Sequence, residues 1–325
     1  MKILITGITG LLGSYLANQL TKVGTVYGFR RRDSNLHLLG SMATQIEWHE
    51  GDLNDFQSLE EAIIGKDMVV HAAGLLPYAS SSEEDFLKVN TEGTANLVNA
   101  MLSSQAGRLV YISSATALGV DPDTQLINEQ YKWTPSELNS PHAVSKHLAE
   151  LEVWRGAQEG LKVMVFNPTT LLPKLTDLRS SAHLYRHLSA PTFRIPKGNI
   201  SYIDIRDASD VILQMIEKAP WDARYILNSE SISFESFTHQ WGKAMNGYGS
   251  EPIRRHILRP YWERVWNPFS KSKAYGRFDG LQKTLADRTI VYDNEKVQRL
   301  IGFGYRPLKE TLTWALGNKS KTVPV

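Results

Sequence analysis

Residues 2–13 read Lys2-Ile3-Leu4-Ile5-Thr6-Gly7-Ile8-Thr9-Gly10-Leu11-Leu12-Gly13, a short apolar run followed at once by a glycine-rich turn. Leu12, Leu16 and Leu20 then repeat at helical spacing, which predicts a strand, a turn and a helix. Glycines in such a turn permit a tight bend and a close approach of the backbone to a diphosphate, whose charge suits the positive end of the helix. The stretch therefore predicts a dinucleotide-binding turn.

Further along the chain, short β-branched runs alternate with amphipathic stretches, which is typical of βαβ units in a parallel sheet. The predicted strands are Lys2 to Thr6, Thr25 to Phe29, Ile46 to His49, Met68 to Ala72, Arg108 to Ser113 and Lys162 to Asn167. The predicted helices are Leu11 to Lys22, Asp55 to Ile64, Glu84 to Ser103 and Ala143 to Gln158. This order predicts an α/β fold with a doubly wound parallel Rossmann sheet.

The pattern changes after Pro168. Prolines at 173, 191 and 196 interrupt the chain, and a strand at Ser201 to Ile205, a helix from about Ala208 to Lys218 and a strand at Tyr225 to Asn228 follow. We expect a dinucleotide-binding domain at 1–168, rejoined by about 201–228. A smaller, interleaved C-terminal substrate lobe is expected at 169–200 and 229–325.

Composition and net charge exclude several classes of function. The 325 residues include 36 Lys plus Arg, 34 Asp plus Glu and no cysteine, so a net charge of +2 provides no overall field for nucleic acid or membranes, and thiol chemistry is excluded. No metal site, nucleic-acid partner or integral membrane segment is expected, and a cytoplasmic location is predicted. A basic, aromatic stretch at 254–277 is interpreted as a pocket wall or lid, with a membrane-surface patch as the alternative.

The end of the second predicted strand carries a cationic cluster, Arg30-Arg31-Arg32, followed by Asp33. A carboxylate at this place usually accepts hydrogen bonds from the adenosine ribose, whereas guanidinium groups hold the 2′-phosphate of NADP through paired donors. We therefore assign Arg31 and Arg32 to cofactor binding and favour NADP. Asp33 leaves NAD as the alternative.

Several further segments resemble the extended short-chain dehydrogenase/reductase family, in particular its dihydroflavonol-reductase-like and epimerase/dehydratase-like members. The matching segments are Thr6 to Gly13, Gly51 to Leu53, His71 to Gly74, Val89 to Thr94, Val110 to Thr116, Phe166 to Thr170, Ser201 to Asp207, Tyr225 to Asn228, Tyr292 to Asn294 and Leu300 to Phe303. Their number and their order along nearly the whole chain make a chance similarity improbable.

The resemblance implies which residues contact the cofactor and which catalyse. The implied cofactor residues are Gly7, Thr9, Gly10, Leu11, Leu12, Gly13, Asp52, Leu53, Ala72, Ala73, Gly74, Asn90, Ser113, Lys146, Asn167, Pro168 and Thr169. The family's serine, which orients the substrate carbonyl, corresponds to Ser114, and its lysine, which holds the nicotinamide ribose, corresponds to Lys146. Substrate contacts are expected near the carboxyl ends of the strands, where packing is the alternative role. The candidates are Leu75, Tyr78, Ala115, Thr116 and Tyr202.

The chain departs from the family at the proton carrier. The family has Tyr-x-x-x-Lys, whereas here His142 stands four residues before Lys146, which places both side chains on one helical face. Histidine is a common general acid or base, but a neighbouring ammonium disfavours the imidazolium. His142 is therefore the candidate proton carrier in a working or weakened enzyme. There are two alternatives. The protein binds the cofactor but has lost the proton-transfer chemistry, or His142 is an engineered or chance substitution in an enzyme that otherwise uses tyrosine.

These observations predict an NADP(H)-dependent oxidoreductase that transfers a hydride between the nicotinamide and a carbonyl or secondary alcohol of a small-molecule substrate. A nucleotide-sugar epimerase or dehydratase and a catalytically inactive NAD(P)-binding protein are the alternatives. Resemblance to the family also suggests a homodimer, paired through the helices predicted at Glu84 to Ser103 and Ala143 to Gln158.

Overall fold

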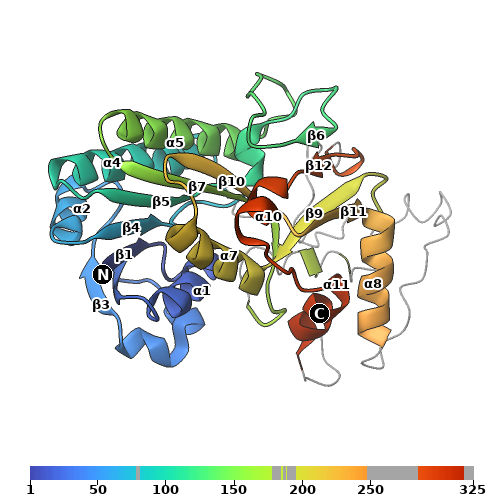
Figure 1. The fold of residues 1–325 in the computed structure, drawn as a ribbon, viewed down its shortest axis with the longest axis horizontal. Helices are drawn as coiled ribbons and strands as arrows, with labels where there is room; N and C mark the ends of the chain where they lie inside the picture. The colour runs from blue at the N-terminus through green and yellow to red at the C-terminus, as the bar shows by residue number, and fades with distance from the viewer. Residues whose placement is uncertain (78–80, 178–183, 186–187, 189–194, 247–284, 318–325) are drawn as a thin grey trace, which may run out of the picture.

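The structure is a computed structural model that describes residues 1–77, 81–177, 184–185, 188, 195–246 and 285–317. Its centre is a seven-stranded, entirely parallel sheet in the order β10-β7-β5-β4-β1-β2-β3 (Figure 1). The strands are β1 (Lys2–Thr6), β2 (Thr25–Arg30), β3 (Glu47–Glu50), β4 (Met68–His71), β5 (Arg108–Ile112), β7 (Lys162–Pro168) and β10 (Ala223–Leu227). This order confirms the predicted doubly wound fold, with the chain reversing direction across the sheet between β1 and β4.

Helices cover both faces of this sheet (Figure 1). The helices are α1 (Leu11–Leu20), α2 (Phe56–Ile63), α4 (Gly93–Ser103), α5 (Pro141–Gln158) and α7 (Ile205–Lys218). Successive strand residues point to opposite faces. Accordingly, Ile3 and Ile5 pack with residues of α1 and α7, whereas Leu4 packs with residues of α2, α4 and α5. The predicted contact of Leu12, Leu16 and Leu20 with the sheet is confirmed, since all three are buried in the first of these clusters.

The stretch predicted as one helix at Glu84 to Ser103 is interrupted. It consists of α3 (Glu83–Phe86), a π-helical turn η2 (Leu87–Glu92) and α4. A π turn adds one residue to the hydrogen-bonded ring and is common at functional sites. Here it contains the buried Asn90, so the interruption affects a residue that the sequence analysis assigned to the site.

Most of the remaining described elements build a second layer beside the strand ends, whereas η1 connects β2 to β3 and packs on α1 (Figure 1). A three-stranded sheet in the order β11-β9-β8 and a two-stranded sheet, β12-β6, are accompanied by three α-helices and two 3-10 helices. These elements are β6 (Leu126–Ile127), β8 (Thr170–Leu172), β9 (Asn199–Asp204), β11 (Glu230–Ser233), β12 (Val291–Tyr292), η1 (His37–Thr44), η3 (Ala115–Leu118), α8 (Phe234–Asn246), α10 (Glu295–Ile301) and α11 (Leu308–Leu316).

This second layer has its own core, in which Tyr202, Phe237 and Trp241 are buried. Within the stretch expected to rejoin the first domain, α7 and β10 pack on or pair with the large sheet, whereas β9 pairs in the small one. The division of the chain into a dinucleotide-binding domain and a substrate lobe stays a prediction.

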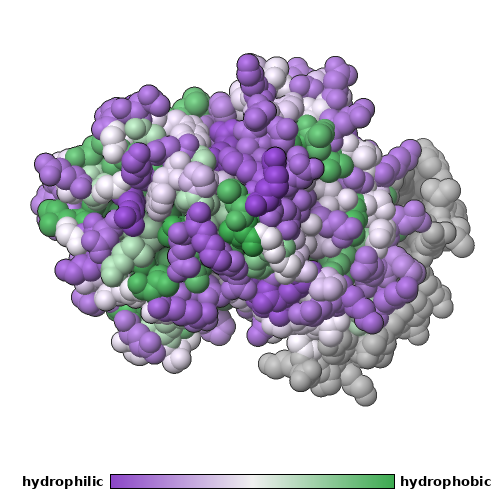
Figure 2. Space-filling model, viewed as in Figure 1, coloured by the Kyte–Doolittle hydropathy of each residue, from purple (hydrophilic) through white to green (hydrophobic). Residues whose placement is uncertain are grey.

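Hydrophilic residues cover much of the surface in Figure 2, and hydrophobic ones form scattered groups between them. Among the helices of the described residues, none is both long and apolar enough to cross a membrane. The expected cytoplasmic location and homodimer stay predictions. The basic stretch at 254–277 lies outside the described residues.

Candidate functional site at the carboxyl ends of the strands

The glycine-rich turn is compressed against β4 and α1. Gly7 has a φ of +67°, and a Cβ added there would lie 2.3 Å from the backbone nitrogen of Ala73. A Cβ on Gly13, in the first turn of α1, would lie 2.2 Å from the carbonyl oxygen of Gly7. Both positions therefore exclude any side chain. The backbone of the turn therefore packs directly on the loop after β4 and on the start of α1, and amide groups at a helix start suit a diphosphate.

The end of β2 provides the cationic groups expected there. Arg30 forms an ion pair with Glu50 at 2.9 Å and lies over the ring of Trp48, so its charge is already engaged. Arg31 and Arg32 are exposed, as is Asp33. At the end of β3, Asp52 accepts hydrogen bonds from the backbone and side chain of Asn54. Two arginines at this edge of the sheet are therefore accessible to an anionic ligand.

Helix α5 brings His142 and Lys146 to the end of β5. The helix begins behind Ser140, whose hydroxyl accepts a hydrogen bond from the backbone of Ala143, and Pro141 occupies its first turn. Lys146 is 5% exposed, and its Nζ donates a hydrogen bond of 3.0 Å to the carbonyl oxygen of Ile112. Burial lowers the pKa of Lys146 to about 8, although the nearby carboxylate of Glu150 opposes this shift.

His142 is equally buried, but one of its ring nitrogens has no partner. Its ring meets the edge of Phe86, with 5.7 Å between the ring centroids, and Nε2 is buried without a hydrogen bond. Burial and, to a smaller extent, the charge of Lys146 lower the pKa of His142 to about 3. The imidazole is therefore neutral at neutral pH, and an unsatisfied buried nitrogen of this kind calls for a ligand or water.

The two serines at the end of β5 differ in environment. Ser113 is buried and donates a hydrogen bond of 2.5 Å to Glu150. Ser114 is half-buried, and its hydroxyl bonds to the side chain and the backbone nitrogen of Thr116 at the start of η3. Only the second hydroxyl lies near the surface, so the structure is consistent with the assignment of the substrate-orienting role to Ser114 rather than to its neighbour.

Asn90 connects three parts of the site. Its side chain accepts a hydrogen bond from the backbone nitrogen of Leu75 and donates to that residue's carbonyl oxygen and to the hydroxyl of Ser145. The Ser145 hydroxyl donates in turn to the carbonyl oxygen of His142. Behind this link, Thr94 donates to the carbonyl oxygen of Asn90. The loop after β4 and the start of α5 are thereby held in fixed relation.

A second hydrogen-bonded group lies under the glycine turn. The ring of the fully buried His71 bonds to the hydroxyl of Thr6 through Nδ1, at 2.6 Å, and to the hydroxyl of Thr94 through Nε2, at 3.1 Å. Burial and the charge of Lys146 lower the pKa of His71 to about 3. The site thus contains two neutral histidines beside one lysine.

Glu150 is not among the residues predicted for the site, although it stands four residues after Lys146 on the face that also carries His142. It is fully buried and accepts hydrogen bonds from Ser113 and Asn167. Its i, i+4 spacing from Lys146 is the signal that was available. Ser113 directly follows β5 and Asn167 lies in β7, two strands that only the fold brings together.

The expected substrate residues are distributed unevenly. Leu75 is half-buried, Ala115 is buried and Thr116 is exposed, all beside the strand ends. Tyr202 lies in the core of the second layer, and its hydroxyl donates to Glu230, which favours a packing role. Tyr78 lies outside the described residues.

The remaining expected cofactor residues follow the fold. Ala72, Ala73 and Gly74 form the loop after β4, and Asn167 and Pro168 end β7. Thr169 follows and bonds to the carbonyl oxygen of Leu227 at the end of β10. They therefore share one edge of the sheet with Ser114 and the glycine turn.

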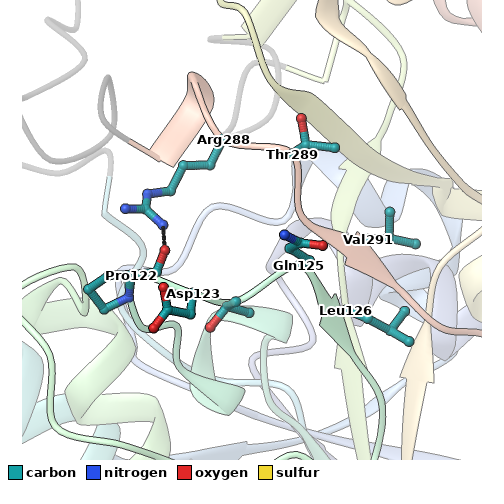
Figure 3. Close-up of a pocket in the computed structure, with 8 residues that line it drawn as sticks. Pro122, Asp123, Gln125, Leu126, Arg288, Thr289 and Val291 are labelled. Atoms are coloured by element: carbon teal, nitrogen blue, oxygen red, sulfur yellow. Dashed lines mark hydrogen bonds between the residues drawn. The ribbon is translucent and has the colours of Figure 1, made fainter.

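A separate hollow of about 740 Å³ lies between the segments 122–126 and 288–291 (Figure 3). Arg288 bridges its rim by donating to the carbonyl oxygen of Pro122, as the dashed line in the figure shows. None of its lining residues belongs to the group around His142 and Lys146, so the hollow is a feature distinct from the strand-end site.

Comparison with known proteins agrees with the geometry. Residues 3–227 match the sequence profile of the NAD dependent epimerase/dehydratase family. The chain belongs to this family. Sterol demethylase protein B of Methylococcus capsulatus is 27% identical over 257 residues, which are 76% of this chain and 75% of that protein. Cinnamoyl-CoA reductase 1 of Petunia hybrida is 27% identical over 244 residues, which are 70% of this chain and 72% of that protein.

A solved structure shows the same fold. The enzyme WbmH of Bordetella bronchiseptica, in complex with NAD+, is 20% identical and aligns with a TM-score of 0.73 over 96% of both chains. Family membership confirms the predicted extended short-chain type, with NAD(P) as cofactor and oxidoreductase chemistry. The roles assigned to individual residues, including His142, stay predictions.

Proposed function

We propose that this family member is an NADP(H)-dependent oxidoreductase that interconverts a carbonyl and a secondary alcohol on a small-molecule substrate. The observation that carries the proposal is the grouping at the end of β5. Lys146 reaches the carbonyl oxygen of Ile112, two residues before Ser114, and His142 lies one helical turn before Lys146. A cationic group, a hydroxyl and an imidazole thus surround one edge of the sheet.

The residues at the strand ends fit a dinucleotide. Gly7 and Gly13 let the turn pack directly on the loop after β4 and on the start of α1, and that helix start offers amide groups to a diphosphate. The exposed Arg31 and Arg32 support NADP over NAD, because guanidinium groups suit the additional 2′-phosphate. Reductases among the relatives, such as the Petunia protein, support the reductive direction.

Each side chain of the group then has a distinct task. When bound, the nicotinamide supplies the hydride. The Lys146 ammonium holds the ribose beside it, and the Ser114 hydroxyl donates a hydrogen bond to the substrate oxygen. His142 faces the most demanding task, because the substrate oxygen must gain a proton when a carbonyl is reduced.

The environment of His142 limits that proton transfer. With a pKa of about 3, only about one ring in 10⁴ is protonated at pH 7. The neutral ring can still donate a hydrogen bond through one nitrogen, but it is a far weaker acid than the imidazolium. We therefore expect slow turnover, with proton delivery rather than cofactor binding as the slow process.

The test replaces His142 by tyrosine. Carbonyl reduction by NADPH is measured across a panel of aldehydes and ketones, and NADPH and NADH affinities are measured by nucleotide fluorescence. We expect His142→Tyr to raise kcat at least tenfold with little change in affinity, and NADPH to bind more tightly than NADH. The paired replacement Arg31→Ser with Arg32→Ser serves as a control, since it removes the preference for NADPH and leaves NADH binding intact.

Two outcomes overturn the proposal. Unchanged turnover in His142→Tyr, on a substrate that the natural chain accepts, excludes His142 as the proton carrier. Conversion of a nucleotide sugar without added NADPH, by protein that retains a co-purified cofactor, indicates the epimerase or dehydratase alternative that the family description includes.

A further inference from the structure

We propose that Glu150 is a positioning residue of the hydride-transfer site: its buried carboxylate fixes the backbone that carries Ser114 and supplies the counter-charge that keeps Lys146 an ammonium. The inference rests on the proposed function, because it assigns work to Glu150 through the two residues that touch cofactor and substrate.

The carboxylate of Glu150 is completely buried and completely engaged. One oxygen, Oε1, accepts hydrogen bonds from the hydroxyl of Ser113 at 2.5 Å and from the amide of Asn167 at 2.6 Å. The other, Oε2, forms an ion pair with Arg224 of β10. Ser113 directly follows β5, Asn167 lies near the end of β7 and Arg224 lies near the start of β10, so Glu150 connects three neighbouring strands of the sheet to α5.

This arrangement determines where Ser114 lies. The same Asn167 amide that donates to Glu150 also donates to the carbonyl oxygen of Ser114, at 2.9 Å. The residue on the other side, Ser113, is held by the carboxylate directly. The carboxylate of Glu150 thus holds Ser113 through its hydroxyl and, by way of Asn167, holds the carbonyl oxygen of Ser114, whose own hydroxyl bonds to Thr116.

The second task concerns charge. Lys146 is buried at the end of β5, where its Nζ lies 4.5 Å from the centre of the Tyr111 ring and bonds to the carbonyl oxygen of Ile112. The titratable groups that interact with it are His142 on its own helix and His71 at the end of β4, both neutral at neutral pH, and Glu150. Among the described groups that influence Lys146, Glu150 is thus the negative one.

Burial alone disfavours an ammonium at this position. The pKa of Lys146, about 8, already includes the stabilising effect of Glu150 against a larger effect of burial. Because this value lies close to neutrality, loss of the carboxylate charge shifts the lysine toward its neutral form under physiological conditions. Arg224 partly cancels the field of Glu150, so its removal acts in the opposite direction.

A purely structural ion pair between Glu150 and Arg224 is the competing explanation. Such a pair stabilises the fold but does not govern the protonation of a third group. The two explanations differ in the pH dependence of cofactor affinity, which falls when Lys146 loses its proton. They also differ in the direction of the expected shifts. Only the electrostatic role predicts that substitutions of Glu150 and of Arg224 shift the pH at which cofactor affinity is lost in opposite directions.

The experiment measures the dissociation constant of NADPH by fluorescence between pH 6 and pH 10, in the natural chain and in three variants. Glu150→Gln keeps the shape and removes the charge, and it should move the alkaline loss of affinity about one pH unit toward acid. Arg224→Met should move it toward alkali. The matched control Glu152→Gln removes a charge from the same helix, where Glu152 pairs with Arg155, and should leave it in place.

The direction of the change is decisive. If Glu150→Gln and Arg224→Met lower affinity equally at every pH, or if Glu152→Gln moves the alkaline limit as far as Glu150→Gln, the assignment is wrong. Thermal unfolding of each variant shows whether it is folded, and Arg224→Met provides a second test should Glu150→Gln not fold. Because cofactor binding requires no turnover, the result is independent of the reductase proposal, which fails separately if no carbonyl is reduced.

Discussion

His142 and Glu150 lie two turns apart on the same face of α5, and both are buried beneath the strand ends, yet their surroundings are opposite. Every contact of the Glu150 carboxylate is made within the chain, by Ser113, Asn167 and Arg224. The Nε2 of His142, in contrast, has no partner. Both carboxylate oxygens at the Glu150 end of this helical face are hydrogen-bonded within the chain, whereas at the His142 end one ring nitrogen is left without a partner.

The difference separates two uses of a buried polar group. A satisfied network fixes backbone and rotamers, and it loses heavily when any member is removed. An unsatisfied nitrogen costs stability in the free protein and becomes useful when a ligand completes its hydrogen bonds. The comparison therefore predicts that stability depends on Glu150, whereas the protein gives up stability to retain His142.

The largest effect on the free energy of unfolding should follow from removing the Glu150 carboxylate. Glu150→Ala leaves the mostly buried guanidinium of Arg224 without its carboxylate and should lower the free energy of unfolding by about 3–5 kcal/mol. Urea denaturation followed by circular dichroism measures this loss. Glu152→Ala, which breaks a half-exposed pair with Arg155, should cost less than about 1 kcal/mol. A loss below that level for Glu150→Ala would remove the contrast between the two ends.

Acidification should lower the stability of the folded chain through His142. His142 has a pKa of about 3 in the folded chain against about 6.5 when unfolded, so the unfolded chain binds the proton first as the pH falls. Its contribution to stability is present above pH 6.5 and is lost progressively toward pH 3. Between pH 7 and pH 5 the loss should be about 2 kcal/mol.

The measurement compares the natural chain with His142→Phe at both pH values, because the difference isolates this residue from other titrating groups. The stability gap should widen by about 2 kcal/mol in favour of His142→Phe as the pH falls. A constant gap would show that His142 is accessible to protons in the folded state.

The smallest effect is expected at neutral pH. His142→Phe removes the unpaired nitrogen and keeps an aromatic ring against Phe86, so the free energy of unfolding should rise by about 1 kcal/mol. His147→Phe is the matched control: this ring stacks on Trp133 at 4.1 Å between centroids and should bring no gain. A destabilised His142→Phe would indicate that the ring nitrogen has a partner in solution.

The sequence was sufficient for the parts of the site that local spacing determines. The strand–turn–helix at the glycine motif, the alternation of strands and helices, and the shared face of His142 and Lys146 follow from the turn residues and from periods of two and 3.6 residues. The partners of Glu150 do not, since Arg224 stands 74 residues away and reaches it only because β10 lies beside β7. The π turn at Asn90 was also missed, because a single extra residue in a helix leaves its apolar pattern almost unchanged.

The separation of β9 from the large sheet had a similar cause. Its sequence, Asn199–Asp204, fits a strand in either sheet, and alternation alone does not say which neighbour it pairs with. Tyr202 illustrates the consequence, because pairing with β8 and β11 places it in the second core and not at the strand ends. Partner choice between sheets is a property of the assembled fold.

The hydrogen bonds around His71 have a definite direction. The Thr94 hydroxyl donates its hydrogen to the carbonyl oxygen of Asn90. Its oxygen can therefore only accept a hydrogen bond from His71, which must carry its hydrogen on Nε2. Nδ1 is then an acceptor, and the Thr6 hydroxyl donates to it. Beneath the glycine turn, each group in the series Thr6, His71, Thr94 and Asn90 thus donates a hydrogen bond to the next, from β1 to the π turn. All three hydrogen bonds exist only while the His71 ring stays in this tautomer.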